Sequence, residues 1–388
     1  MYGSIDVANV TKTHSTAAGA QVSKTTGIGE GFNAGNRIGF RGNEDLGGGM
    51  TTGFVIEQGL NITNGQLFSS RAAAGGQQVD GVSASGNMPG GAYSTGTSRQ
   101  AFVSLADSTM GEVRAGYQYT ALYTVSTNSG YHLGSEQPGG DMAHGTLNNA
   151  DFGGTRANGL TYISPRFSGV QVTLQKGAGS GREDVTFSTQ AGAPSNRITD
   201  KNNRQSILLN YTAGPLNASY AHTSMKIEQS AATTGAFPIT IFGSLSATAY
   251  TAASGAAKNQ SNTLDQLAGS YTLGALKLAA HYSKGKIDDS ATTANSLDTK
   301  ATQIGAEYTM GKFRPFAISG NSTNVLKSSG ATTFDAKSSM YGARYDLSKR
   351  TLAYVMSGKV TDSGTLNAAA ATTIAERKAT AIGLYHSF

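Results

Sequence analysis

The side chains with the clearest chemical potential are arginines that alternate with small residues near the start of the chain. In an extended strand, Arg37 and Arg41 would share one face with Gly39, while Ile38 and Phe40 would lie on the other face. Guanidinium groups keep their charge at neutral pH and are suited to contacts with anions. The spacing therefore predicts an electrostatic role for Arg37 and Arg41.

Residues typical of catalysis or metal binding do not form recognisable motifs. The absence of cysteine excludes disulfides, thiolate zinc sites and cysteine nucleophiles. The six histidines lack metal-ligand spacing. The glycine-rich stretch at 27–31 lacks the helix and Lys-Ser/Thr pair of a phosphate-binding loop. Asp288 and Asp289 are too few to complete a Ca²⁺ shell. We predict no enzymatic activity, no cofactor and no metal.

The overall composition is unusual for a chain of 388 residues. Glycine accounts for 51 of them, apolar residues for 38% and charged residues for 14%, whereas soluble domains are richer in both apolar and charged residues. The net charge is +6, but no run rich in Lys and Arg is present, which argues against a nucleic-acid partner. No stretch of eighteen apolar residues could form a membrane-spanning helix.

Hydrophobic residues recur with a period of two, which predicts β-strands with one apolar and one polar face. The apolar faces include Ile38 and Phe40, the alternate positions 170–174 and 304–308, and four residues around 356. A further strand at the C-terminal end of the chain places Ile382, Leu384 and Phe388 on one face. The group around 356 consists of Leu352, Tyr354, Met356 and Val360.

Short and long connections alternate along the chain. Short links are expected at 42–49, 106–111, 165–169, 213–215, 272–274, 310–312 and 347–350. Long polar stretches are expected at about 11–34, 61–98, 120–155, 177–203, 227–262, 285–300, 323–336 and 361–376. These links separate 16 candidate strands of about ten residues, a length that suits a tilted crossing of the hydrocarbon layer. We therefore treat 1–388 as one domain.

The polar faces indicate which way such a sheet must face. Gly, Ser, Thr, Gln, Arg and Lys cannot build a dry core, and a closed barrel of this many strands is too wide for side chains to fill. The prediction is an all-β, 16-stranded antiparallel transmembrane barrel with lipid outside and water inside. Tyrosines near strand ends predict interfacial girdles; they are Tyr211, Tyr308, Tyr345 and Tyr385.

Several motifs resemble the general porins of β-proteobacteria, the neisserial type of Gram-negative outer-membrane porin. They are NRIGFRGNEDLGGG at 36–49, GFVIEQGL at 53–60, RQAFVSL at 99–105, NGLTYISP at 158–165 and the terminal AIGLYHSF. The resemblance implies short periplasmic turns, long extracellular loops and a third loop, about 120–155, folded into the barrel. It also implies an outer-membrane homotrimer in contact with lipids and lipopolysaccharide, with small ions and solutes in transit. Phe388 would act in recognition by the barrel assembly machinery.

The same resemblance suggests which residues line the pore. Arg37 and Arg156 match wall arginines, and Glu57 matches an acid near them. Alternation places Arg156 on the face of Leu160 and Tyr162, so a bulge near Asn158–Gly159 is expected. In the stretch GYQY at 116–119, Tyr117 replaces an arginine found in many relatives, which weakens the expected anion selectivity. Strand parity adds Arg41, Arg344 and Lys359, and the third loop supplies Glu136, Asp141 and Asp151.

Three functions are compatible with these observations. The first is a water-filled channel for passive diffusion of small hydrophilic solutes, with a weak preference for anions. The second is a substrate-specific anion channel, which one anion at low concentration would block saturably. The third is a surface adhesin or interaction scaffold that acts through its long loops.

Overall fold

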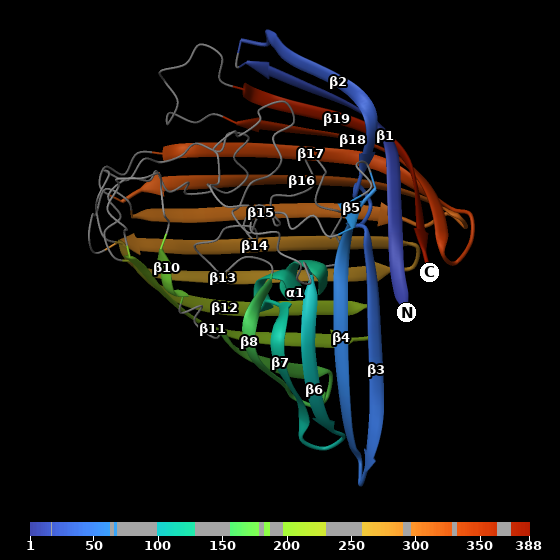
Figure 1. The fold of residues 1–388 in the computed structure, drawn as a ribbon. Coiled ribbons are helices and arrows are strands. Elements are labelled where there is room, and N and C mark those ends of the chain that lie inside the picture. The colour runs from blue at the N-terminus through green and yellow to red at the C-terminus, as the bar shows by residue number, and fades with distance from the viewer. Residues whose placement is uncertain are drawn as a thin grey trace.

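The computed structural model describes residues 1–16, 18–62, 66–67, 99–128, 156–177, 182–186, 197–229, 258–289, 296–327, 332–362 and 374–388. In this part of the chain, nineteen strands pair in one antiparallel sheet, accompanied by the helix α1 (Ala121–Asn128). Figure 1 shows the sheet curving round so that β1 (Tyr2–Thr16) lies beside β19 (Ile374–Ser387). These two strands pair from Ser4↔Ser387 to Thr16↔Ile374, which closes the barrel.

The wall consists of sixteen strand positions, as predicted. The strands β2 (Gln21–Glu30) and β3 (Arg37–Gly47) share one position, because both pair with β1. Two short strands, β5 (Gln66–Leu67) and β10 (Arg182–Thr186), pair only at the edge of β4 and β11. The remaining wall strands are β4 (Met50–Asn61), β6 (Gln100–Asp107), β7 (Gly111–Tyr119), β8 (Arg156–Ile163), β9 (Val170–Gly177), β11 (Arg197–Ala213), β12 (Leu216–Gln229), β13 (Lys258–Leu273), β14 (Leu276–Asp289), β15 (Leu297–Tyr308), β16 (Phe313–Leu326), β17 (Thr332–Asp346) and β18 (Thr351–Asp362).

At one end of the barrel the chain reverses within a few residues. Between β11 and β12 the reversal takes place at Gly214, and between β13 and β14 at Gly274, with φ of 53° and 57°. These left-handed values suit glycine, which has no Cβ to clash. The short-turn end therefore follows from the sequence, and the predicted alternation of short and long connections is present along most of the wall.

The outer face carries the apolar side chains expected to meet lipid. Ile304 and Ile382 are each 65% exposed, and Phe40, Leu174 and Leu384 are also exposed. Three of the predicted girdle tyrosines, Tyr211, Tyr308 and Tyr345, lie exposed on this face close to the short-turn end. Within the described residues, no helix is long and apolar enough to span a membrane.

Several strands are longer than predicted, and the first long loop was placed wrongly. The stretch 11–34 is mostly strand, because β1 continues to Thr16 and β2 begins at Gln21. Thr11 pairs with Thr26, so polar β-branched residues extend the ladder beyond the apolar band. A hydrophobic pattern marks the part of a strand that meets lipid, and it cannot mark the part that extends into water.

A second correction concerns the faces of β18 and β19. Tyr354 and Met356 are buried and belong to an apolar cluster on the inner face, with Val10 and Phe32, whereas their neighbour Val355 is the exposed residue on the outer face. Tyr385 packs against the same cluster and not in a girdle. The prediction that Leu352, Tyr354, Met356 and Val360 meet lipid is therefore wrong. Alternation gives the two faces, but not which is outside when both carry apolar residues.

The helix α1 lies inside the barrel. Its residues Ala121 and Val125 are fully buried against Leu208, Ala221 and Ala268 of β11, β12 and β13. The carboxamide of Gln175 accepts a hydrogen bond from the Ala121 N–H at 2.7 Å. Figure 1 shows α1 within the ring of strands. The described start of the third loop thus folds inward.

Candidate functional site

A cluster of charged and phenolic side chains surrounds Glu57 on the inner wall. Glu57 Oε1 accepts a hydrogen bond from Arg99 Nε at 2.5 Å, and Arg37 Nε lies 3.8 Å from Oε2. The Tyr2 hydroxyl donates to Oε2 at 3.0 Å, and the Tyr119 hydroxyl donates to Oε1 at 3.2 Å. We call Tyr2, Arg37, Glu57, Arg99 and Tyr119, together with Arg156, the Glu57 cluster.

Strand register explains why these groups meet. Gly39 pairs with both Tyr2 and Glu57, so all three lie on the inner face beside Arg37. The Tyr2 ring lies across Gly39, where an added Cβ would come within 2.4 Å of it. Because glycine leaves this space, the Tyr2 hydroxyl reaches the carboxylate.

Arg156 joins the cluster through two aromatic rings. Its guanidinium carbon lies 4.9 Å from the ring centroid of Tyr119 and 5.8 Å from that of Tyr123 on α1. The two rings stack at 4.2 Å. Pairing of β7 with β8 is continuous through Asn158 and Gly159, so the bulge expected there is absent. Arg156 instead begins β8, where the strand emerges from the loop.

Two further predicted residues lie on the same wall. The Arg41 guanidinium carbon is 5.4 Å from the Tyr2 ring centroid, a cation–π contact. Tyr117 on β7 pairs with Ala101 on β6 and with Asn158 on β8. Lys359 is placed differently from its prediction. It lies on the outer face, 2.9 Å from Glu376, because it shares parity with exposed Val355.

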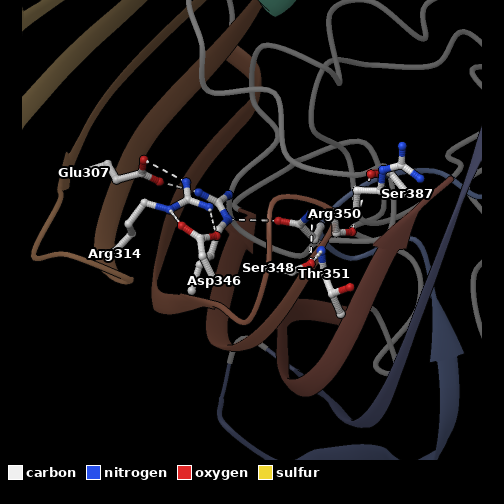
Figure 2. Close-up of polar contacts among 9 residues, drawn as sticks. Glu307, Arg314, Asp346, Ser348, Arg350, Thr351 and Ser387 are labelled. Atoms are coloured by element: carbon white, nitrogen blue, oxygen red, sulfur yellow. Dashed lines mark hydrogen bonds and ion pairs between the residues drawn. The ribbon is translucent and has the colours of Figure 1, made fainter.

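A second cluster surrounds Glu307 near the short-turn end. Arg314 donates twice to Asp346, at 2.7 and 2.8 Å, and once to Glu307 at 3.2 Å. Arg344 forms an ion pair with Glu307 and donates from Nε to Asn33 Oδ1 at 2.9 Å. Figure 2 shows Arg314 between Glu307 and Asp346. Arg314 and Arg344 are direct cross-strand partners, so Glu307 offsets their mutual repulsion.

The two clusters differ in charge. In the Glu307 cluster two arginines meet two carboxylates. Among the described residues, the Glu57 cluster holds three arginines, Arg37, Arg99 and Arg156, and one carboxylate. The Glu57 cluster therefore presents net positive charge to the barrel interior, where low-dielectric walls strengthen its field.

Sequence reasoning missed several members of these clusters. Arg99 stands in the quoted RQAFVSL motif, but it precedes β6, and strand parity does not apply to it. Glu307 and Arg314 lie at strand ends beside short turns, where charged residues are common. Only the bidentate geometry with Asp346 distinguishes Arg314 from an ordinary surface charge.

Glu136, Asp141 and Asp151 lie outside the described residues. Phe388 exchanges backbone hydrogen bonds with Gly3, and its ring fills the space that a Cβ on Gly3 would occupy. Among the described residues, no group of three or more His, Cys, Asp or Glu side chains could hold a metal ion.

Solved structures share this architecture. An anion-selective porin from Comamonas acidovorans matches with a TM-score of 0.67 and 21% identity, covering 100% of this chain and 98% of that one. OmpT of Vibrio cholerae matches at 0.62 and 14%, covering 100% and 96%. Salmonella typhi OmpF, in complex with daunomycin, matches at 0.61 and 16%, also covering 100% and 96%. No curated protein sequence matches the chain significantly.

A closed antiparallel barrel that is apolar outside and charged inside defines a channel-forming protein of the bacterial outer membrane. Residues 1–365 match the family model of the Gram-negative porins, and the chain belongs to that family. It is accordingly a porin that forms a transport channel across the outer membrane.

Proposed function

We propose that the channel passes small hydrophilic solutes and ions by passive diffusion, with a weak preference for anions and no enzymatic activity. The observation that carries this proposal is the Glu57 cluster, whose described residues include three arginines and one carboxylate. Rings of charged side chains set ion preference in pores. The similar Comamonas structure is described as an anion-selective porin, which supports the direction of the preference. Tyr117, where many relatives have arginine, keeps the preference weak.

The experiment is a reversal-potential measurement in a planar bilayer under a KCl gradient. Replacing Arg37 and Arg156 with Glu should shift the potential towards cations. Lys312→Glu with Lys349→Glu is the matched control, because it changes the same charge in exposed short turns. An unchanged reversal potential in the first variant would show that Arg37 and Arg156 do not set the ion preference. Saturable block by one anion at low concentration would instead favour a substrate-specific channel.

The third loop is proposed to narrow the pore, with Glu136, Asp141 and Asp151 facing the arginines. The inward position of α1 supports this proposal, because the loop begins on the inner wall. Neutralising all three acids should raise anion preference in the same bilayer measurement. An anion preference equal to that of the parent would mean that the acids lie away from the ion path.

We also propose that the porin is a homotrimer whose outer face binds lipopolysaccharide phosphates. On the side of the long loops, lysines follow the apolar residues along the outward face. Lys284 pairs directly with Lys300, and Lys359 with Lys378. Like charges placed opposite each other destabilise a sheet. Glu376 lies between Lys359 and Lys378, at 2.9 and 2.7 Å. Asp265 is the cross-strand partner of Lys284 on the side away from Lys300, so the space between Lys284 and Lys300 is suited to an anionic headgroup.

Binding to purified lipopolysaccharide tests this assignment. Lys284→Gln with Lys300→Gln should retain less lipopolysaccharide in native mass spectra than the parent trimer, whereas Lys312→Gln with Lys349→Gln should retain as much. Equal retention in both double variants would refute the lysine assignment, and a monomeric mass throughout would refute the trimer.

Phe388 is proposed to serve in recognition by the barrel assembly machinery. Phe388→Ala should refold in detergent in vitro but accumulate poorly in the outer membrane of cells. If both yields fell equally, the contact with Gly3 would explain the loss, and recognition would not be needed.

A further inference from the structure

The wall strand formed by β2 and β3 is interrupted, and the residues between the two strands turn into the barrel. Residues 31–36, GFNAGN, separate Glu30 from Arg37 and take part in no ladder. Phe32 is 1% exposed and belongs to the inner apolar cluster with Val10 and Tyr354. We call residues 31–36 the inner strap.

The carboxylate of Asp6 makes most of the hydrogen bonds that hold this segment, and Glu30 adds one from Asn36 Nδ2 at 2.9 Å. Asp6, which is fully buried on β1, accepts hydrogen bonds on Oδ2 from the N–H groups of Asn33 and Ala34, at 2.5 and 2.8 Å. Its Oδ1 accepts one from the Tyr354 hydroxyl at 2.6 Å. The Asp6 N–H donates to Asn36 Oδ1 at 2.5 Å. The middle of the strap and its Asn36 end are therefore attached to one residue.

The strap also contacts both charged clusters. Asn33 Oδ1 accepts the hydrogen bond from Arg344 of the Glu307 cluster. At the other end, a Cβ on Gly35 would lie 3.2 Å from Arg99 Nη1 of the Glu57 cluster. The segment thus lies between the two sets of arginines on the inner wall.

We propose that the inner strap is part of the selectivity-determining surface, and that Asp6 is the positioning residue that fixes it there. The side-chain oxygen Oδ1 of Asn33 holds the Arg344 guanidinium beside Glu307, and Asp6 holds the backbone N–H of Asn33. This inference deepens the proposed anion-preferring channel, since it names further residues that set the preference.

Two variants separate positioning from simple stability. Asn33→Ala keeps the backbone N–H that Asp6 binds but removes the acceptor for Arg344, so the reversal potential should shift while the barrel stays as heat-resistant as the parent. Asp6→Asn should shift the potential and also raise open-channel current noise, because an amide cannot accept all three donors. The control is Asn9→Ala, which removes an exposed amide from β1.

The cysteine-free chain allows a direct probe of the strap. After reaction with a negatively charged, water-soluble methanethiosulfonate, Ala34→Cys should show reduced conductance and reduced anion preference. Thr26→Cys, exposed on β2, should react without either change.

Unchanged potentials in both Asn33→Ala and Asp6→Asn would overturn the proposal, as would an Ala34→Cys protein whose modification leaves conductance unchanged. These outcomes are distinct from failure of the proposed function. If replacing Arg37 and Arg156 with Glu shifts the reversal potential and the strap variants do not, the channel proposal stands and the strap inference falls.

Discussion

At the scale of single residues, Glu57 offsets the charge of the arginines around it on the inner wall. Its side chain is 5% exposed, and it is the carboxylate against which Arg37 and Arg99 are balanced. Two phenolic hydroxyls donate to the same group. A change here alters the local field without altering the shape of the wall.

We predict that Glu57→Gln strengthens anion preference, because the arginines keep their charge while the carboxylate loses its own. The reversal potential in a KCl gradient should move further in the anion direction. The loss of charged hydrogen bonds should cost about 1–3 kcal/mol of stability, visible as a lower temperature for the heat-induced shift on gels. Glu44→Gln, at an exposed position of β3, is the control. A potential equal to that of the parent would contradict the prediction.

Part of the site could be predicted from residue spacing. Arg37 and Arg41 follow from alternation within β3, because a regular strand fixes every second side chain on one face. Arg99 and Arg156 do not follow, since one precedes its strand and the other begins it. The Asp6–Tyr354 contact joins residues 348 positions apart. Such a contact depends on barrel closure, which no local pattern encodes.

At the scale of elements, the strands repeat one packing arrangement. An aromatic side chain on one strand lies across a glycine on its neighbour: Tyr2 across Gly39, and Tyr354 across Gly383. In both cases the hydroxyl then reaches an inner carboxylate. The glycines on these inner faces are therefore required for space and not for turns.

We predict that Gly383→Ala destabilises the barrel. The new Cβ would lie 2.4 Å from the Tyr354 ring, and overpacking of this kind costs about 1–3 kcal/mol. The measurement is the temperature at which the folded band disappears on a gel. Gly27→Ala on β2 is a matched control, since its Cβ would meet no atom within 4 Å. Equal temperatures for the two variants would show that Tyr354 can move aside.

The number of strands and the short turns were predictable, because turn residues and a period of two are local signals. Strand ends were not, as the stretch 11–34 shows: Thr11 and Thr26 pair without an apolar pattern. Which face of β18 meets lipid could not be predicted either. Tyr354 and Val355 are both suited to lipid, and only the packing of Tyr354 on Gly383 decides between them.

At the scale of the whole molecule, ion preference should depend on salt. The arginine-rich wall acts through its field, and the screening length falls from about 10 Å at 0.1 M to about 3 Å at 1 M. We predict a larger anion-to-cation permeability ratio at a mean concentration of about 0.03 M than at about 1 M, where the field is screened. The check is a set of reversal potentials at a fixed gradient ratio. A ratio independent of salt would indicate direct ion binding instead.

The barrel interior is not uniform around its circumference. Across β11, β12 and β13, α1 covers the wall with Val125 against Leu208. Across β16 to β19 and β1, Phe32 is buried with Met340 and Met356 in the inner apolar cluster. In these two sectors a second layer of buried apolar side chains covers the inner face of the wall.

This second layer has a consequence for any solute that crosses. The space filled by these apolar side chains is closed to ions, so the hydrated path runs off-centre, along the arginines and the polar side of the inner strap. A permeating solute with an anionic end and an apolar side would be oriented on passage, with its anionic end towards the arginines. The protein could thus sort molecules of equal bulk by the internal arrangement of their charge.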